Sequence, residues 1–241
     1  MKNGIIIQAR MGSKRLPQKV MRKICGTPVI GLIVSRSLQS NSIDEVIVAT
    51  TTKREDDELC EYLQSINCKF FRGNDEDVRS RYIETANTFK IDNIVRVTAD
   101  CPIVDPQMID EMMDLFIKNQ DVDYLTNRLP PTFPDGLDIE IFSREALIQS
   151  ASLSSSKFDL EHVTPMLYKA DFTVENFRSE LDLSRYRWTV DEIDDLFVIR
   201  KIYENFFPDI FFGWKEALAF AMENPDLTEQ NLDITRDEGS V

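Results

Sequence analysis

The chain has few of the residues that build metal centres and disulfide frameworks. Its 241 residues include one histidine and four cysteines, Cys25, Cys60, Cys68 and Cys101, and no two of these cysteines have the C-x-x-C spacing of a zinc site. We therefore interpret the cysteines as small, partly buried apolar residues. The N-terminus lacks an apolar stretch long enough for a signal peptide, and no segment reaches the length of a membrane span. These absences predict a cytoplasmic protein with reduced thiols.

Positive charge is also scarce. The chain has 28 Lys and Arg against 42 Asp and Glu, so its formal net charge is -14. This acidity argues against a nucleic-acid surface, which needs a basic face. The exception is the first segment, because Met1 to Lys23 contains no Asp or Glu. An acidic protein can bind a nucleotide where the site itself is basic, so this segment is the first candidate for a phosphate site.

Strand and helix patterns alternate through the first half of the chain. Apolar residues make up 42% of the sequence, which is enough for a real core. We predict strands at 4–9, 44–50, 68–71 and 93–98, and helices at 28–38, 54–64, 76–89 and 106–116, with Pro28 in the first turn of its helix. Repeated strand–helix–strand units predict a three-layer α/β fold with a mostly parallel twisted sheet.

The rhythm changes after residue 123. We predict strands at 123–126, 138–142, 172–176 and 186–190, and helices at 194–206 and 214–223. The chain has no linker rich in Gly, Ser or Pro and no internal repeat, so we predict one domain over 1–241 with an insertion at about 129–177. The tail from Asn224 is polar, and we expect it to be frayed.

The loop after the first strand concentrates the basic residues. It reads Gln8-Ala9-Arg10-Met11-Gly12-Ser13-Lys14-Arg15-Leu16-Pro17-Gln18-Lys19. Ligands of parallel sheets bind beyond the carboxyl ends of the strands, and the backbone N–H groups of a Gly-Ser turn can face a phosphate. The loop is neither a Walker A motif nor a dinucleotide fingerprint, since Gly12 stands alone. A solvated basic loop is the alternative interpretation.

Two aspartates follow predicted strands. Asp100 comes after the strand at 93–98, and Asp191 comes directly after the strand at 186–190. If these strands are neighbours, their ends lie roughly 5 Å apart, and both carboxylates could reach one Mg²⁺ ion. The alternative is that each aspartate caps the helix that follows it.

The basic loop resembles the A-R-x-G-S-x-R-L-P-x-K signature of the sugar-acid cytidylyltransferases, which make CMP-sialic acid and CMP-3-deoxy-manno-octulosonate. Within this superfamily the chain is most similar to the spore-coat polysaccharide biosynthesis protein F group. The runs 98–106 and 188–196 resemble the family's two metal motifs. The resemblance extends from Ile5 to Leu196. It implies that Asp100 and Asp191 are metal ligands, and that Asp195 either caps a helix or lies behind the ligands and supports them. It also implies a nucleotide-diphospho-sugar transferase (Rossmann-like) fold, CTP as the nucleotide, and a homodimer.

Two positions depart from the family pattern. Gln8 stands where many sialic-acid enzymes have Pro, and we expect this difference to alter contacts with the base. Gln18 stands where Gly is usual before the Lys. Glycine takes a positive φ easily and glutamine rarely does, so the second difference should change the freedom of the loop.

The resemblance also implies residues for each substrate. For the nucleotide they are Gln8, Ala9, Arg10, Gly12, Ser13, Arg15, Lys19 and Arg81. Arg81 has a second interpretation, as a helix-surface arginine paired with Asp77 or Glu84.

Acceptor residues come from two later runs. Asp138 and Glu140 share one face of a predicted strand and could bind a sugar hydroxyl or an amine. The alternative for this pair is the water-facing side of an edge strand. His162, or its neighbour Glu161, could contact the acceptor, but a lone histidine can equally be a structural residue.

These observations predict a Mg²⁺-dependent nucleotidyltransferase that moves CMP from CTP to a sugar acid or sugar-like acceptor for surface polysaccharide synthesis. Arg15, Lys19 and Asp100 are its predicted catalytic residues. One alternative is a glycosyltransferase of similar fold, but the D-x-D pair typical of that class is absent at Asp100-Cys101-Pro102. The other is a nucleotide-binding protein without catalysis, against which the joint presence of Lys19, Asp100 and Asp191 argues.

Overall fold

A computed structural model describes residues 1–232, 234 and 236 of the chain. Its main sheet consists of β1 (Asn3–Gln8), β4 (Glu45–Thr51), β5 (Lys69–Gly73), β6 (Asn93–Thr98), β7 (Tyr124–Thr126), β8 (Glu140–Ser143) and β9 (Val174–Asn176). The strand order is β5-β4-β1-β6-β8-β7-β9. All neighbours are parallel except β8, which is antiparallel to β6 and β7. The predicted mostly parallel sheet is confirmed.

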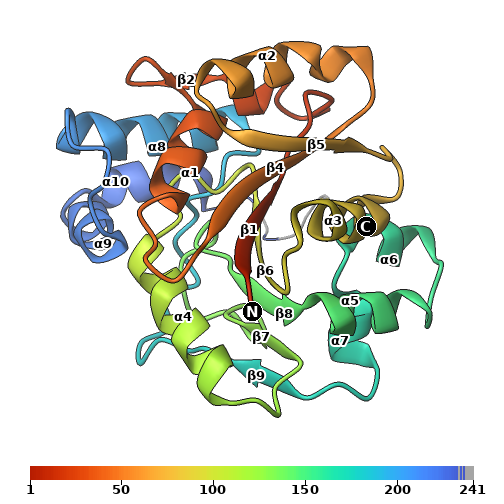
Figure 1. Ribbon diagram of the computed structural model, residues 1–241. Helices are drawn as coiled ribbons and strands as arrows, with labels where there is room; N and C mark the ends of the chain where they lie inside the picture. The colour runs from red at the N-terminus through yellow and green to blue at the C-terminus, as the bar shows by residue number, and fades with distance from the viewer. Residues whose placement is uncertain (233, 235, 237–241) are drawn as a thin grey trace.

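Helices cover both faces of this sheet (Figure 1). The α-helices are α1 (Val29–Ser37), α2 (Asp57–Ser65), α3 (Val78–Phe89), α4 (Pro106–Lys118), α5 (Arg144–Ala151), α6 (Lys157–His162), α7 (Pro165–Lys169), α8 (Ile193–Phe206), α9 (Trp214–Glu223) and α10 (Pro225–Thr228). Short 3₁₀ helices lie at η1 (Lys19–Met21), η2 (Arg54–Asp56) and η3 (Glu229–Asn231), and a small hairpin joins β2 (Lys23–Ile24) to β3 (Thr27–Pro28). Pro28 therefore ends β3 and precedes α1, and its predicted place in the first turn of the helix is wrong.

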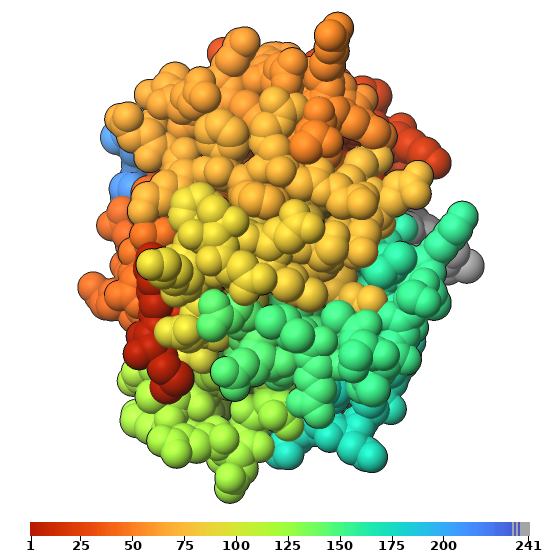
Figure 2. Space-filling view, turned by 45° about the vertical axis from the view of Figure 1, so that its right-hand side comes forward, coloured from red at the N-terminus to blue at the C-terminus, as the bar shows by residue number. Residues whose placement is uncertain are grey.

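The core forms two apolar layers, one on each face of the sheet. Side chains of a strand alternate between faces, so Ile5 and Ile7 of β1 join the layer under α1, α2, α4, α8 and α9. Ile6 points the other way, to α3, α5 and α7. All three isoleucines are fully buried, and each stabilises the fold by about 2 kcal/mol. Figure 2 shows the outer side of the second layer, where α3 lies against the segment from α5 to α7.

The predicted strand at 186–190 is wrong. This segment is extended, but its partners are loops: Arg187 forms a single β-bridge with Asp135, and the Val190 N–H donates to the Asp100 carbonyl at 2.8 Å. Because a single β-bridge is not a continuous row of strand hydrogen bonds, the segment does not belong to the sheet. The hydrogen bond to Asp100 nevertheless brings Asp191 beside that residue, as the predicted strand was expected to do.

The segment 129–177 supplies β8 and β9 to the main sheet and contains α5, α6 and α7. These three helices were not predicted, because each is only five to eight residues long and has little periodic pattern. β8 lies between β6 and β7. The alternative that placed Asp138 and Glu140 on a water-facing edge strand is therefore wrong.

The tail is more ordered than expected over its first part. Residues 225–231 form α10 and η3, and Asn231 is buried, with its Nδ2 donating to the Arg187 carbonyl at 3.0 Å and to Asp195 Oδ1 at 2.9 Å. The prediction of fraying is wrong there, and at 233, 235 and 237–241 it lies outside the described residues.

The cysteines behave as predicted. All four are free thiols: Cys60 and Cys101 are buried, and Cys25 and Cys68 are half-buried. Among the helices of the described residues, none combines the length and the apolar character that crossing a membrane requires.

Candidate functional site

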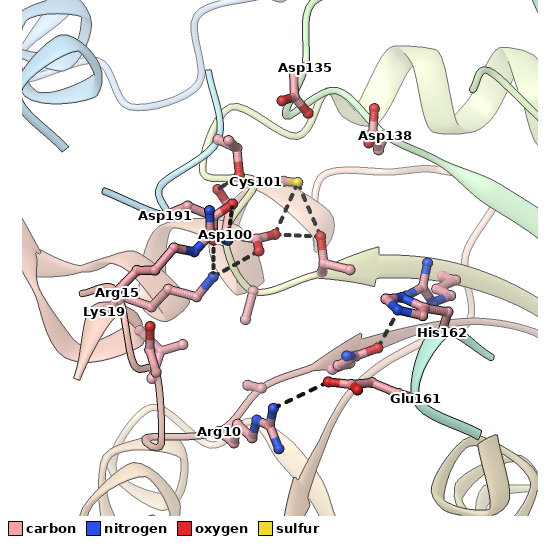
Figure 3. A pocket seen from close by; sticks show the side chains of 18 of the residues that line it. Arg10, Arg15, Lys19, Asp100, Cys101, Asp135, Asp138, Glu161, His162 and Asp191 are labelled. Atoms are coloured by element: carbon pink, nitrogen blue, oxygen red, sulfur yellow. Dashed lines mark hydrogen bonds and ion pairs between the residues drawn. The ribbon is translucent and has the colours of Figure 1, made fainter. Parts of the chain in front are cut away.

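A pocket of about 580 Å³ opens at the carboxyl ends of β1 and β6 (Figure 3). Every residue predicted for nucleotide, acceptor or metal lines it, namely Gln8, Ala9, Arg10, Gly12, Ser13, Arg15, Lys19, Arg81, Asp100, Asp138, Glu140, His162 and Asp191. The structure also brings in charged residues that the sequence analysis did not select: Lys14, Arg96, Arg128, Asp135 and Arg187. The pocket therefore has one basic end near β1 and one mixed-charge end near β8.

Lys19 lies at the centre of the first end. Its Nζ donates to Asp100 Oδ2 at 2.8 Å and to Asp191 Oδ1 at 2.7 Å, and Arg15 Nη2 lies 3.1 Å from Asp191 Oδ2. Burial opposes the charged form of Lys19, but the two carboxylates hold the pKa of its ammonium well above the ordinary value. Burial would raise the pKa of Asp100, and Lys19 instead holds it well below its usual range. Both groups are therefore charged at neutral pH.

Asp100 is held in place from both sides. The Thr98 hydroxyl donates to Asp100 Oδ1 at 2.5 Å, and the Asp100 carbonyl accepts from the Val190 N–H. The cap of the next helix, α4, is Asp105, whose Oδ1 accepts from the backbone N–H groups of residues 107 and 108. The alternative that Asp100 is a helix cap is wrong.

Asp191 owes its position to Asp195, which is fully buried. Asp195 Oδ2 accepts from the backbone N–H groups of Asp191 and Glu192, both at 3.0 Å. Arg187 binds Asp195 with two hydrogen bonds, Nε to Oδ1 at 2.9 Å and Nη2 to Oδ2 at 3.1 Å. The expected capping role of Asp195 is confirmed, and the carboxylate of Asp191 faces Lys19 instead of capping α8.

The two aspartates around Lys19 fit a Mg²⁺ ion. Their oxygens already converge on one cationic nitrogen, and carboxylate oxygens are ligands that Mg²⁺ prefers. Across residues 1–232, 234 and 236, no group of three or more His, Cys, Asp or Glu is arranged to hold a metal. Mg²⁺ is commonly bound by one or two carboxylates, with phosphates and water completing its shell. Asp100 and Asp191 are therefore the residues that would hold such a metal.

The basic loop is tied down by a buried carboxylate. Asp56 is fully buried, and its Oδ1 accepts from the Met11 N–H at 2.7 Å. The Ser13 N–H donates to the Met11 carbonyl at 2.8 Å. This N–H is thus used inside the turn, and the prediction that it faces the pocket is wrong for Ser13.

Gln18 has the backbone conformation that glycine favours. Its φ is 57° and its ψ is 30°, in the left-handed region, which costs a non-glycine residue about 1–2 kcal/mol. The residue that stands in place of the usual glycine therefore holds its backbone under strain.

Acidic partners lie beside three basic side chains of the loop, Arg10, Arg15 and Lys19. Arg10 lies 3.5 Å from Asp75 and 3.6 Å from Glu161, as Figure 3 shows for Glu161. Lys19 has only 17% of its side chain exposed, so the solvated-loop alternative is wrong for this residue. Phosphate oxygens could replace the carboxylate partners of Arg10, Arg15 and Lys19.

The second end of the pocket is built around Glu140, whose side chain is 2% exposed. Strand register places Arg96 of β6 opposite Glu140 of β8. Arg96 Nη1 and Arg128 Nη1 donate to Glu140 Oε1 at 2.7 and 2.9 Å. Burial opposes ionisation, but the two arginines hold the pKa of Glu140 below its ordinary value. An arginine inside the apolar run Asn93–Thr98 was the sequence signal for this pair, since a buried charge needs a partner.

The turn that carries Asp135 and Asp138 is pressed against the segment 187–189. Gly136 has a φ of 98°, and a Cβ there would lie 2.5 Å from the backbone carbon of Trp188, so only glycine fits. Arg187 Nη1 lies 2.7 Å from Asp135 Oδ2, and Arg128 Nε lies 3.1 Å from Asp138 Oδ2. Burial and the nearby carboxylate of Asp138 nonetheless raise the pKa of Asp135 to about 7.

Arg81 and His162 complete the lining. Arg81 is buried and its Nη1 donates to the Asn74 carbonyl at 2.9 Å, so the alternative of a surface ion pair is wrong. His162 is half-buried at the end of α6, with its ring 4.3 Å from that of Phe158. Their roles toward nucleotide and acceptor stay predictions.

Known proteins share this architecture. The family model for cytidylyltransferases matches residues 4–225. Spore coat polysaccharide biosynthesis protein SpsF of Bacillus subtilis is 32% identical over 95% of this chain and 98% of its own length. The structure of a cytidylyltransferase from Leptospira borgpetersenii superposes with a TM-score of 0.92 at 35% identity, over 98% of this chain and 100% of that one. CMP:2-keto-3-deoxy-manno-octonic acid synthetase complexed with CTP superposes with a TM-score of 0.66 at 19% identity, over 85% and 99% of the two chains, and shows the fold alone.

Proposed function

This chain belongs to the cytidylyltransferase family, and on that premise we propose that it moves CMP from CTP to a sugar acid or sugar-like acceptor and releases pyrophosphate. The observation that carries the proposal is Lys19 held between Asp100 and Asp191, beside a basic loop at the strand ends. The relationship to a spore coat polysaccharide biosynthesis protein supports surface polysaccharide synthesis as the pathway.

The basic end of the pocket binds the triphosphate. Arg10, Gly12 and Ser13 contact phosphate oxygens, while Arg15 and Lys19 exchange their carboxylate partners for the β and γ phosphates. Asp100 and Asp191 would hold Mg²⁺, which would supply positive charge at the phosphates. The acceptor oxygen attacks the α-phosphorus in line, and Arg15 and Lys19 offset the charge of the departing pyrophosphate.

The other end of the pocket binds the acceptor. Asp138, Glu140 and His162 contact it, and Arg81 supports the nucleotide from the side of α3. We place the interface of a homodimer in the segment 129–177. Two apolar residues of this segment, Phe133 and Leu167, are buried within the chain itself. Phe158 remains 41% exposed. A monomer by light scattering at micromolar concentration would contradict the dimer.

The test follows pyrophosphate release with each NTP, Mg²⁺ and a panel of sugar acids and sugar phosphates. We expect release with CTP only when an acceptor is present, and a loss of about 100- to 1,000-fold in kcat/KM for Lys19→Ala, the usual effect of removing a group that stabilises transition-state charge. CTP binding without turnover on any acceptor would instead indicate a non-catalytic nucleotide-binding protein. Release of a nucleoside diphosphate from nucleotide sugars would indicate a glycosyltransferase.

A further inference from the structure

The turn 135–138 brings two carboxylates together, and two of their partners, Arg187 and Arg128, are shared with other carboxylates. Asp135 and Asp138 lie together on the side of the pocket away from Arg10 (Figure 3). Asp135 shares its partner Arg187 with Asp195 and Asp191, which lie 2.9 and 3.5 Å from that guanidinium. Burial and the nearby carboxylate of Asp138 raise the pKa of Asp135.

A cation from the same chain already lies on this turn. Arg236 Nη2 donates to Asp138 Oδ1, and its Nε lies 3.7 Å from Asp135 Oδ1. Its side chain is 18% exposed, so the guanidinium is largely buried against the two aspartates. The carboxylates of Asp135 and Asp138, as the fold positions them, can therefore bind a positively charged nitrogen donor together.

The arginines near this turn are engaged by carboxylates. Arg96 and Arg128 both donate to Oε1 of Glu140, and Arg128 also pairs with Asp138. Oε2 of Glu140 is buried and has no hydrogen-bond partner in the part of the chain that the structure describes. A hydrogen-bond donor on the acceptor would satisfy this oxygen, whereas an added negative group would meet further repulsion.

We propose that the acceptor carries a protonated amine, and that Asp135 and Asp138 bind this amine where the guanidinium of Arg236 now lies. The proposal rests on the cytidylyl transfer proposed above and adds one chemical property of the acceptor. An ammonium group has three N–H donors, and Asp135 and Asp138 each direct an Oδ1 atom toward the position of the guanidinium. A sugar acid with a free amine satisfies both proposals, because the amine offsets its carboxylate.

The experiment uses sugar acids in matched pairs, which differ only in having a free amine or an N-acetyl group at the same carbon. Pyrophosphate release gives kcat/KM for each at a pH where Asp135 is ionised. Wild type should prefer the amine by about 10- to 100-fold, the scale of one hydrogen bond to a charged group. Asp138→Asn should lose most of this preference, and Asp121→Asn, at an exposed position between α4 and β7, should keep it.

Arg236 provides an independent measurement, which also serves if Asp138→Asn fails to fold. Arg236→Ala removes the competing cation, so the KM for the amine should fall while the KM for the N-acetyl compound stays unchanged. Arg236→Lys keeps the charge and should leave both KM values near those of wild type.

The outcomes separate the two proposals. CTP turnover with equal kcat/KM for both members of each pair overturns the amine site and leaves cytidylyl transfer intact. If no acceptor is turned over, calorimetry of the same pairs on CTP-loaded enzyme decides, and equal or undetectable binding of the amines overturns the proposal. An increased Mg²⁺ requirement in Asp138→Asn, with the amine preference unchanged, would show that the turn holds a metal ion and would also overturn it.

Discussion

The two ends of the pocket both pair cations with carboxylates, but they do so at different depths. At the phosphate end, Lys19, Asp100 and Asp191 keep 17%, 22% and 18% of their side chains exposed. At the acceptor end, Arg96 and Glu140 keep 8% and 2%. The members of a partly exposed ion pair can leave each other and bind phosphate or metal instead. When a buried ion pair is broken, the remaining charge has neither a partner nor water around it. The first end therefore suits ligand exchange, and the second suits a fixed framework.

The largest effect should follow from removing a carboxylate at the exchangeable end. Asp100→Asn and Asp191→Asn should each nearly abolish turnover, because each removes a negative charge from the predicted metal site. The free energy of unfolding should change by about 1 kcal/mol or less, since Lys19 keeps one carboxylate partner and the two facing carboxylates repel each other without metal. Kinetics over a Mg²⁺ titration, with denaturant unfolding of the same samples, measures both quantities.

The double variant sharpens this prediction. Once one ligand is lost and the metal with it, losing the second should cost little more, so the two effects on kcat should be strongly non-additive. Near-wild-type turnover of either single variant at low Mg²⁺ would show that the aspartate concerned is not a metal ligand.

The buried end should respond in the opposite way. Arg96→Met leaves Glu140 enclosed with one fewer partner, and we expect a loss of about 3–5 kcal/mol in the free energy of unfolding. Arg54→Met, at an exposed position in η2, is the control and should change it by about 0.5 kcal/mol or less. A loss below about 1 kcal/mol for Arg96→Met would mean that the ion pairs at both ends of the pocket can be broken equally easily.

Asp135 makes the acceptor end sensitive to pH. Its pKa is about 7 in the folded chain against an ordinary value of 3.8, so between these values the folded state binds more protons than the unfolded state. The stability contribution is fully present below about pH 3.8 and is lost as the pH rises through 7. Asp135→Asn cannot ionise, so its stability relative to wild type should increase from pH 5 to pH 8. Unfolding curves at the two pH values test this, and a constant difference would contradict the raised pKa.

The smallest expected effect lies in the basic loop. Gln18→Gly removes the strain of a positive φ, and the gain should be about 1 kcal/mol, reduced by the extra chain entropy of glycine. Turnover should stay within about twofold of wild type, because the loop already has the conformation that glycine favours. Destabilisation by Gln18→Gly would show that the Gln18 side chain contributes more than its backbone costs.

Much of the architecture follows from local patterns. The strand Asn93–Thr98 and the helix Trp214–Glu223 begin and end at the predicted residues, because apolar runs and helical periodicity are properties of neighbouring residues. Short helices such as Lys157–His162 were missed, since a segment of one or two turns has almost no period to detect. The segment 186–190 has a strand-like composition, but only its tertiary neighbours decide whether an extended segment joins a sheet.

By itself, the sequence determined the mostly parallel α/β sheet, the basic loop at its first strand end and the aspartates that follow it, because strand ends converge on one edge of such a sheet. Tertiary structure alone decided which charges meet. Lys19 and Asp191 are 172 positions apart, Arg96 and Glu140 are 44 apart, and Arg236 and Asp138 are 98 apart. Strand register and packing set such pairs, and the pairs in turn set the pKa values and the balance of charge at each end of the pocket.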